Sequence, residues 1–221
     1  MFTPLQILYE DNHIIAVYKP AGVLSQGDDT GEDSVFDLVK KYIKEKYNKQ
    51  GNVFLGLVHR LDRPVSGIMI FAKTSKGASR LSEQFRNHEV EKTYHAVVLG
   101  KMPQKKGLVF SHLKKNKDKN KTFVHKVADA ETKESELSYE VVESNNKYSL
   151  LKVKPLTGRS HQIRAQLSSI GHPIFGDVKY GALKPLPDNS IMLSSTGLIF
   201  RAATGDELVK LEIPPFELPK I

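Results

Sequence analysis

The segment HRLDRPVSGIMIFAK, residues 59–73, holds an acidic side chain between two arginines, followed by a polar turn and then an apolar run. Asp62 lies between Arg60 and Arg63 in a turn bounded by proline and glycine. Cationic neighbours favour the ionised form of a carboxyl group, and an accessible carboxylate can act as a nucleophile, a general base or a stabiliser of an oxocarbenium-like centre. A structural ion pair also perturbs a carboxyl group, so the spacing alone leaves a catalytic and a structural role open for Asp62.

A second candidate cluster is GRSHQIR, residues 158–164, where a glycine-led loop precedes a predicted helix. The N–H groups at a helix N-terminus attract anions, so Arg159 and this helix end could bind one. Arg164 would lie one turn further, on the face shared with His161, where its guanidinium could pair with a carboxylate such as Asp62. The alternatives are a hydrogen-bonded N-terminal residue for His161 and, for Arg164, a surface ion pair of at most about 1 kcal/mol.

Other chemical classes find little support in the sequence. The histidines show no HExxH or HxxxH spacing with a nearby acid, so we expect no metal site. The chain has no cysteine, which excludes a thiolate nucleophile, a disulfide and a cysteine-based zinc site. There is no P-loop, no GxGxxG after a strand and no GxSxG elbow, although a Ser-His-Asp triad stays open. We therefore expect chemistry that needs no cofactor.

The first motif is predicted to lie between two helices. Residues 7–18 predict two short strands around a turn. A capping box at Ser34–Asp37 and apolar residues at helical spacing predict a helix over residues 34–47. A second helix is predicted over residues 76–87, and the end of the motif itself, residues 67–72, predicts a strand.

The second half of the chain predicts further strands and one helix. Residues 93–100 predict a strand, and residues 137–153 predict a hairpin whose turn, Asn145-Asn146, tolerates positive φ. A helix is predicted over residues 160–170, ended by glycine and proline. The side chains predicted to share one face of this helix are His161, Arg164 and Ser168.

The composition predicts one domain over residues 1–221. A chain of this length with 39% hydrophobic residues can bury a substantial core. Strands outnumber helices and several are joined by short turns, so we expect an α+β fold with a mixed, largely antiparallel sheet. No window approaches the roughly 18 consecutive apolar residues of a membrane span, and no signal region opens the chain, so we expect a cytoplasmic protein without membrane contact.

The positive charge is concentrated in an arm at about residues 101–126. This segment has nine lysines and one acid, whereas the rest of the chain has 24 basic and 24 acidic residues. A dense run of lysines attracts a phosphate backbone and gives salt-dependent affinity. The alternative is a solvated hairpin that charge keeps soluble. The lysines that we expect to contact phosphate are Lys114, Lys115, Lys117 and Lys119.

Four motifs in the order HRLDRPVSGIMIFAK, KTYHAVVLG, GRSHQIR and GDVKYG resemble the RluA-type family of RNA pseudouridine synthases. The resemblance runs from ILYEDNHIIAVYKPAGVLSQ to IMLSSTGLIF and LEIPP, nearly the whole chain. The fold that it implies, a mainly antiparallel sheet flanked by helices and loops, agrees with the prediction above. Many relatives carry an N-terminal RNA-binding domain of the S4 type; here the pattern begins by about Ile7, so we expect none.

The resemblance implies roles for individual residues. Asp62 falls on the catalytic aspartate, Tyr94 on the active-site tyrosine beside the target base, and Arg164 on the arginine that pairs with that aspartate. Leu193 lies where the family places an apolar residue that lines the pocket. The residues suggested for contact with RNA are Arg60, Arg63, Arg159 and His161, whereas His59 is a candidate for a structural role.

The sequence departs from the family pattern at two places. Val65 stands where the family usually has threonine, and Ser194-Ser195 where His-Ala is common. Val65 puts in doubt any hydrogen bond from a side chain at this position and leaves Asp62 itself unchanged.

The implied reaction is the isomerisation of uridine to pseudouridine. It breaks the C1′–N1 bond, turns the base, joins C1′ to C5 and removes the C5 proton, so no ATP, metal or redox carrier is required. A stacked base must first be flipped out of the RNA, at a cost of a few kcal/mol. Asp62 would then attack the sugar or base, or remove a sugar proton to give a glycal. Tyr94 would stack on the uracil or bind it, and removal of the C5 proton by Tyr94 stays open.

The expected partner is a structured RNA, ribosomal (23S) or transfer, with a short stem-loop preferred. We expect a monomer without an obligate protein partner, because the sequence has no heptad pattern or long apolar stripe. Two alternatives from other classes are a catalytically silent RNA chaperone and a nucleoside glycosidase that releases free uracil.

Overall fold

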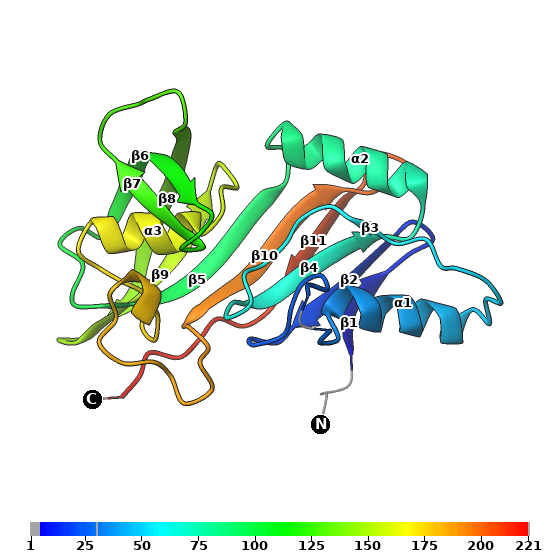
Figure 1. The fold of residues 1–221 in the computed structure, drawn as a ribbon, viewed down its shortest axis with the longest axis horizontal. Coiled ribbons are helices and arrows are strands. Elements are labelled where there is room, and N and C mark those ends of the chain that lie inside the picture. The colour runs from blue at the N-terminus through cyan, green and yellow to red at the C-terminus, as the bar shows by residue number, and fades with distance from the viewer. Residues whose placement is uncertain (1–4, 30, 221) are drawn as a thin grey trace. The chain divides into compact units, whose positions relative to one another are not determined.

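Residues 5–29 and 31–220 are described by a computed structural model, in which the chain forms two compact units (Figure 1). Unit 1 contains the chain up to Val90 together with Ser195–Ile213. Unit 2 contains Glu91–Ser194 together with the chain from Pro214. Two compact units can belong to one domain, so the expectation of a single domain stays a prediction.

The strands of unit 1 form a sheet in the order β1-β2-β4-β10, with β3 on β4 and β11 on β10. The pairs β1·β2, β2·β4, β3·β4 and β10·β11 are antiparallel. The predicted hairpin over residues 7–18 is confirmed, and Asp11 Oδ1 closes its turn by accepting the N–H of His13 and of Ile14. The strand bounds are β1 Gln6–Glu10, β2 Ile14–Lys19, β3 Gly56–Leu57, β4 Ser66–Ala72, β10 Leu193–Arg201 and β11 Leu208–Glu212.

Both helices of unit 1 begin at a side-chain cap. Helix α1 (Val35–Lys46) starts at the predicted capping box, in which Ser34 Oγ accepts the Asp37 N–H and the Asp37 carboxylate accepts the Ser34 N–H. Helix α2 (Ser75–Arg86) starts one residue earlier than predicted, because Thr74 Oγ1 caps the Gly77 N–H.

The two helices cover opposite faces of β4. Phe36 of α1 meets the ring of Phe71 edge-on, with the ring centroids 6.1 Å apart. Leu81 of α2 packs instead with Ile70 and Ala72, which point to the other face because side chains alternate along a strand. This cover on both sides explains why each residue of β4 is buried.

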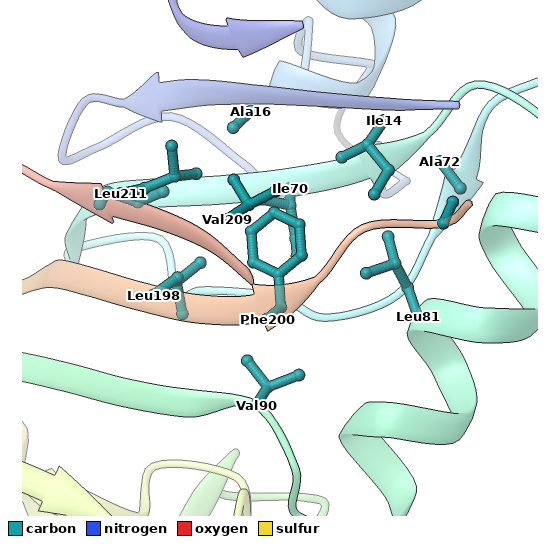
Figure 2. Close-up of a cluster of buried hydrophobic side chains, with 12 residues drawn as sticks. Ile14, Ala16, Ile70, Ala72, Leu81, Val90, Leu198, Phe200, Val209 and Leu211 are labelled. Carbon is teal, nitrogen blue, oxygen red and sulfur yellow. The ribbon is translucent and has the colours of Figure 1, made fainter. Parts of the chain in front are cut away.

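The core on the α2 face of unit 1 joins residues from β2, β4, β10, β11 and α2 (Figure 2). Figure 2 shows the Phe200 ring in the middle of this cluster, with Ile70 and Val209 beside it. Phe200 is 1% exposed, and burying a phenylalanine side chain contributes about 1.5–3 kcal/mol. The cluster therefore ties the two chain segments of unit 1 together.

Unit 2 contains an antiparallel sheet in the order β5-β9-β8-β6-β7. The hairpin predicted over residues 137–153 is confirmed as β8 and β9, but neither asparagine of its turn has positive φ. The Asn145 side chain forms the turn instead, because its Oδ1 accepts the N–H groups of Lys147 and Tyr148. The strand bounds are β5 Glu91–Leu99, β6 Lys106–Asn116, β7 Lys121–His125, β8 Lys133–Ser144 and β9 Tyr148–Pro155.

Helix α3 (Gln162–Ser169) packs on one face of this sheet, where Ala165 joins a small cluster with Leu113 of β6 (Figure 1). The helix is shorter than the predicted 160–170. His161 has φ +53°, a left-handed conformation that stops the helix from extending toward Ser160. A 3₁₀ turn, η1 (Val178–Tyr180), follows and packs against α3.

No helix in the described ranges is long and apolar enough to cross a membrane.

Candidate active site

Asp62 lies in the loop between β3 and β4 of unit 1, in a turn whose backbone is fixed on both sides. The Val65 N–H donates to the Asp62 carbonyl at 3.0 Å and closes the turn. On the other side, the buried Ser25 hydroxyl donates to the Leu61 carbonyl at 2.6 Å and accepts the Leu61 N–H at 3.1 Å. The Asp62 side chain is half-buried. The sequence therefore positions a carboxylate on a rigid turn without burying it completely.

Lys19 supports the same turn from beneath. Its side chain is 0% exposed, and its Nζ donates to the carbonyls of Pro20, Arg63 and Val65 at 2.9, 3.1 and 2.7 Å. Burial lowers the pKa of Lys19 to about 7, the negative charge of Asp62 opposes this shift, and the charge of Arg63 adds to it. The ammonium group thus stabilises the turn and interacts electrostatically with the carboxylate of Asp62. Sequence analysis missed Lys19; the only signal was a lysine between an apolar strand and a proline.

Arg63 and His59 have structural partners. Arg63 Nε donates to the Gly22 carbonyl at 2.9 Å, and a terminal nitrogen pairs with Glu32 at 2.6 Å in an exposed ion pair. His59 Nε2 accepts the Ile70 N–H at 2.9 Å, so this nitrogen carries no proton, and the ring stacks on Phe85. The suggested structural role of His59 therefore agrees with its contacts. Arg60, by contrast, is exposed.

The motif also contains a glycine that no other residue can replace without movement. Gly67 has φ +123°, and a Cβ at this position would lie 2.3 Å from the Ser195 carbonyl oxygen. The backbones of β4 and β10 are therefore in close contact. Val65, where the family usually has threonine, is 3% exposed and acts through its backbone, because its N–H closes the turn and its carbonyl accepts from Lys19.

In unit 2, the motifs GRSHQIR and GDVKYG form one polar cluster around Arg164. The guanidinium donates from Nε and a terminal nitrogen to the two carboxylate oxygens of Asp177, at 2.7 and 2.9 Å. Both side chains are buried, at 6% and 1% exposure. A surface ion pair, the alternative considered for Arg164, is therefore wrong. Sequence analysis missed Asp177, because nothing in one sequence shows that two segments 13 residues apart meet in this way.

Tyr180 contacts all three side chains that were predicted to share a face of α3. Arg164 lies over its ring at 5.0 Å, His161 Nδ1 is hydrogen-bonded to its hydroxyl at 2.8 Å, and Ser168 Oγ donates to its carbonyl. The hydroxyl also accepts the Thr122 N–H at 2.8 Å. The predicted common face is thus confirmed, and it faces η1.

The loop before α3 is held by Gln162. Its Oε1 accepts the Arg159 N–H at 3.0 Å and the Thr157 hydroxyl at 2.7 Å, and its Nε2 donates to the Glu136 carbonyl. Arg159 Nε donates to the Glu134 carbonyl at 3.1 Å, although the residue is exposed. An anion at this helix end therefore stays a prediction.

Tyr94 and Leu193 also belong to unit 2. Tyr94 is half-buried in the middle of β5, opposite Val153 of β9. Lys92 lies on the same face of the strand, two residues earlier, and burial lowers its pKa. Leu193 is 3% exposed at the start of β10. Asp62 lies in unit 1, so its association with these residues and with Arg164 stays a prediction.

The lysine-rich arm is the hairpin of β6 and β7. Its tip turns at Asn120, which has φ +42°. Lys114 pairs with Glu131, and this hydrogen bond raises the pKa of Lys114. The other three predicted phosphate contacts, Lys115, Lys117 and Lys119, are exposed. Across residues 5–29 and 31–220, no group of three or more acidic, histidine or cysteine side chains gathers that could hold a metal ion.

Comparison with known proteins gives one family. The family model described as RNA pseudouridylate synthase matches residues 13–169. The ribosomal large subunit pseudouridine synthase C of Rickettsia bellii is 37% identical over 211 residues, which cover 93% of this chain and 67% of the relative. The tRNA pseudouridine synthase C of Haemophilus ducreyi is 37% identical over 193 residues, covering 81% of this chain and 75% of the relative.

A further relative is covered over a smaller share of its length, and a solved structure over a larger share. The ribosomal large subunit pseudouridine synthase D of Borreliella burgdorferi is 34% identical over 182 residues, 80% of this chain but 55% of the relative. Among solved structures, human RNA Pseudouridylate Synthase Domain Containing 4 is 24% identical with a TM-score of 0.79, covering 97% of this chain and 89% of that chain. This structural likeness confirms the predicted α+β fold.

Proposed function

Because this chain belongs to the RNA pseudouridylate synthase family, whose model matches residues 13–169, we propose that it isomerises uridine to pseudouridine in structured RNA. The observation that carries the proposal is the rigid turn at Asp62, held by Ser25 and by the buried ammonium group of Lys19. Similar proteins are named for action on ribosomal or transfer RNA, which supports RNA of these classes as the substrate.

Asp62 is the proposed catalytic group. In one route its carboxylate attacks C1′ or the base, and in the other it removes a sugar proton to give a glycal. In both, the C1′–N1 bond breaks, the base turns, C1′ joins C5 and the C5 proton is released. Both routes need an ionised carboxylate, which a nearby cation favours. Lys19 supplies such a charge in unit 1. We propose that Arg164 supplies the second, with Asp177 holding one edge of its guanidinium while the remaining terminal nitrogen pairs with Asp62.

Tyr94 is proposed to stack on the flipped uracil or to hydrogen-bond it, and Leu193 to provide apolar contact in the base pocket. Base flipping costs a few kcal/mol, which contacts between basic side chains and the RNA backbone offset. For these contacts we propose Arg60, Arg63, Arg159 and His161, together with the lysines of the arm. Arg60 and Arg159 are exposed, and Arg63 would have to exchange its ion pair with Glu32 for phosphate.

Tritium release from RNA labelled at C5 of uridine tests the reaction. We expect the pure protein to release tritium from a panel of cellular RNAs and the Asp62→Asn variant to lose about 10²–10⁴-fold in rate while still binding RNA. Asp206→Asn, the same change at an exposed position, is the control. Free uracil among the products would indicate a glycosidase instead. Absence of release from every RNA in the panel would end the proposal.

The arm is proposed to contribute salt-dependent affinity. Replacing Lys114, Lys115, Lys117 and Lys119 by alanine should reduce the slope of log affinity against log salt by about 0.9 for each duplex phosphate that these lysines neutralise. Lys41 and Lys44, exposed on α1, provide control substitutions. A slope that equals that of the unchanged protein would mean that the arm is only a solvated hairpin.

A monomer in the cytoplasm, without an obligate protein partner, remains part of the proposal. Sedimentation of the pure protein at several concentrations tests the monomer, and a mass that rises with concentration would contradict it.

A further inference from the structure

One face of the unit 2 sheet points away from α3, and we call it the outer face of unit 2. Exposure alternates along β6: Val109, Ser111 and Leu113 are buried, whereas the even-numbered residues between them are exposed or half-buried. The buried set packs toward α3, where Leu113 contacts Ala165. The outer face therefore consists of the even-numbered residues of β6 and their neighbours across the sheet.

The strand registers arrange these side chains in rows. In one row, Lys106 of β6 lies opposite Glu140 of β8, which lies opposite Lys152 of β9, which lies opposite His95 of β5. In the next row, Leu108 lies opposite Ser138, and Ser138 lies opposite Lys154. The two rows enclose an open hollow of about 500 Å³, lined by Lys106, Gly107, Leu108, Ser138, Tyr139, Glu140, Lys152 and Lys154.

The hollow carries a net positive charge. Three lysines line it against one acid, Glu140, whose carboxylate pairs with Lys106 at 2.9 Å. The hydrogen bond from Lys106 lowers the pKa of Glu140, so this acid stays ionised at neutral pH. His95 adds no charge there, because burial and the charge of Lys152 lower its pKa. Lys152 and Lys154 lie on the same side of β9 and remain available for an anion.

Apolar side chains are exposed beside these cations. Leu108 is 73% exposed and Phe110 is 58% exposed. Phe110 also meets His112 edge-on, with the ring centroids 5.3 Å apart. The same face continues along β6 to Lys114, opposite Phe123 of β7, and Lys114 is one of the arm lysines that we expect to contact phosphate. Phe110 lies opposite Glu136 of β8 and on the same face of β6 as Lys106 and Lys114. An exposed aromatic ring on a sheet that also carries lysines can stack on an unpaired base while the cations bind phosphates.

We propose that the outer face of unit 2 binds a single-stranded segment of RNA, with a phosphate at Lys152 and Lys154 and a base on the ring of Phe110. The inference rests on the proposed function for its choice of RNA as the ligand. It goes beyond that function because none of the residues proposed for catalysis lies in the hollow. The site would extend the phosphate contacts of the arm along β6 and across the sheet to β8 and β9.

The test is the binding of a fluorescent single-stranded RNA of about 12 nucleotides, a length within the range that a sheet-based module covers. Fluorescence anisotropy measures its affinity at several salt concentrations between about 50 and 200 mM. The variants are Lys152→Ala/Lys154→Ala and Phe110→Ser. Lys41→Ala/Lys44→Ala is the matched control, because it removes the same charge from exposed positions of unit 1.

The lysine pair should reduce the salt slope by about 1.4, which corresponds to two neutralised phosphates of single-stranded RNA, and the control pair should leave it unchanged. Phe110→Ser should weaken binding roughly five- to 150-fold without changing the slope, because the variant cannot stack on a base and no charge is removed. Binding of a blunt RNA duplex, whose bases are not available for stacking, should not respond to Phe110→Ser. Circular dichroism checks that each variant is folded.

Three results would overturn the inference. Equal salt slopes for Lys152→Ala/Lys154→Ala and Lys41→Ala/Lys44→Ala would mean that only the net charge of the protein matters. Retention of single-stranded affinity in Phe110→Ser would remove the stacking contact. Loss of polyglutamate binding in the Lys152→Ala/Lys154→Ala variant, with RNA binding unchanged, would make the partner an acidic polypeptide.

Tritium release is measured on the same preparations and separates this inference from the proposed function. If the protein binds RNA through the outer face but releases no tritium, the inference is supported and the proposed function is contradicted. If the protein releases tritium and its outer-face variants bind RNA as tightly as the native protein, the proposed function is supported and the inference is contradicted.

Discussion

Lys19, which supports the Asp62 turn in unit 1, and Arg164 in unit 2 are both buried cations, but their surroundings stabilise them differently. In unit 1, Lys19 is surrounded by three backbone carbonyls, and its pKa falls to about 7. In unit 2, Arg164 has a carboxylate partner, Asp177, and lies over the ring of Tyr180. Carbonyl dipoles only partly replace the water that an ammonium group loses, whereas a carboxylate compensates the charge directly. The positive charge in unit 1 therefore depends on pH near neutrality, and the one in unit 2 is permanent.

Removing the carboxylate in unit 2 should have the largest effect on stability. Asp177→Asn removes the carboxylate that binds the buried guanidinium of Arg164 through two nitrogens, and breaking a buried pair in this way costs about 3–5 kcal/mol. Urea unfolding measures the loss, and Asp188→Asn, at an exposed position, is the control. A decrease of less than about 1 kcal/mol in the free energy of unfolding, the contribution of a surface ion pair, would show that Asp177 does not stabilise the cluster around Arg164.

Removing the cation in unit 1 should cost less. Lys19→Met leaves buried carbonyls without a donor, at about 1–3 kcal/mol, while it relieves the cost of burying the ammonium group. We also expect tritium release to fall, because the Asp62 turn loses its support. Lys41→Met, at an exposed position, is the control. If Lys19→Met unfolds the protein more readily than Asp177→Asn does, the comparison between the units is reversed.

The pH dependence sharpens the comparison further. The folded pKa of Lys19 is about 7 and the ordinary value is 10.5, so the unfolded chain binds more protons between these two pH values. The contribution of Lys19 to the free energy of unfolding therefore rises from pH 7 toward 10.5 and is absent below 7. Urea unfolding at pH 7 and pH 9 should show the native protein gaining stability relative to Lys19→Met. A constant difference between the two proteins would mean that Lys19 keeps its proton throughout.

Glu10 shows whether the type of partner or the unit determines how a cation is stabilised, because it is a carboxylate partner of two lysines in unit 1. This unit 1 carboxylate binds Lys73 at 2.6 Å and Lys46 at 2.7 Å. Burial alone raises the pKa of Glu10, but the hydrogen bonds from both lysines, Tyr47 and Tyr42 lower it to about 2. Its stabilising contribution is thus complete above pH 4.5 and is lost as the pH falls toward 2. The free energy of unfolding of Glu10→Gln, measured between pH 4.5 and 2, should not show the decrease that the protonation of Glu10 causes in the native protein. The same pH dependence in both proteins would contradict the role of the ion pairs.

The smallest effect is expected at the exposed pair of Lys114 and Glu131. Lys114→Ala should leave the midpoint of urea unfolding unchanged, because solvent screens an exposed ion pair. A clear shift of the midpoint would mean that burial is not what separates this pair from Arg164 and Asp177.

Structural features that depend on residues close together in the sequence could be predicted. The capping box at Ser34, the hairpin of β1 and β2 and the shared face of α3 follow from spacing and from side-chain hydrogen bonds within a few residues. Of the proposed catalytic groups, Asp62 was singled out by its charged neighbours, and Tyr94 only by the resemblance to the family.

Partners that come from distant segments were not readable. Lys19 acts on carbonyls 44 and 46 residues away, and a lysine beside a proline looks like an ordinary surface residue until the turn folds over it. Asp177 stood in the GDVKYG motif without a role, because its contact with Arg164 depends on how η1 packs on α3. The left-handed conformation of His161 was also missed; its side chain is hydrogen-bonded to Tyr180, a residue that the sequence did not connect with it.

The close contact between Gly67 and Ser195 also determines how the region around Asp62 can be engineered. A variant library that randomises residues 59–73 can vary Arg60, which is exposed, and can exchange Val65 for side chains of similar size. At position 67 even one methyl group would overlap the neighbouring strand, so surviving clones should all keep glycine there. Library diversity is therefore better placed on the solvent side of the turn.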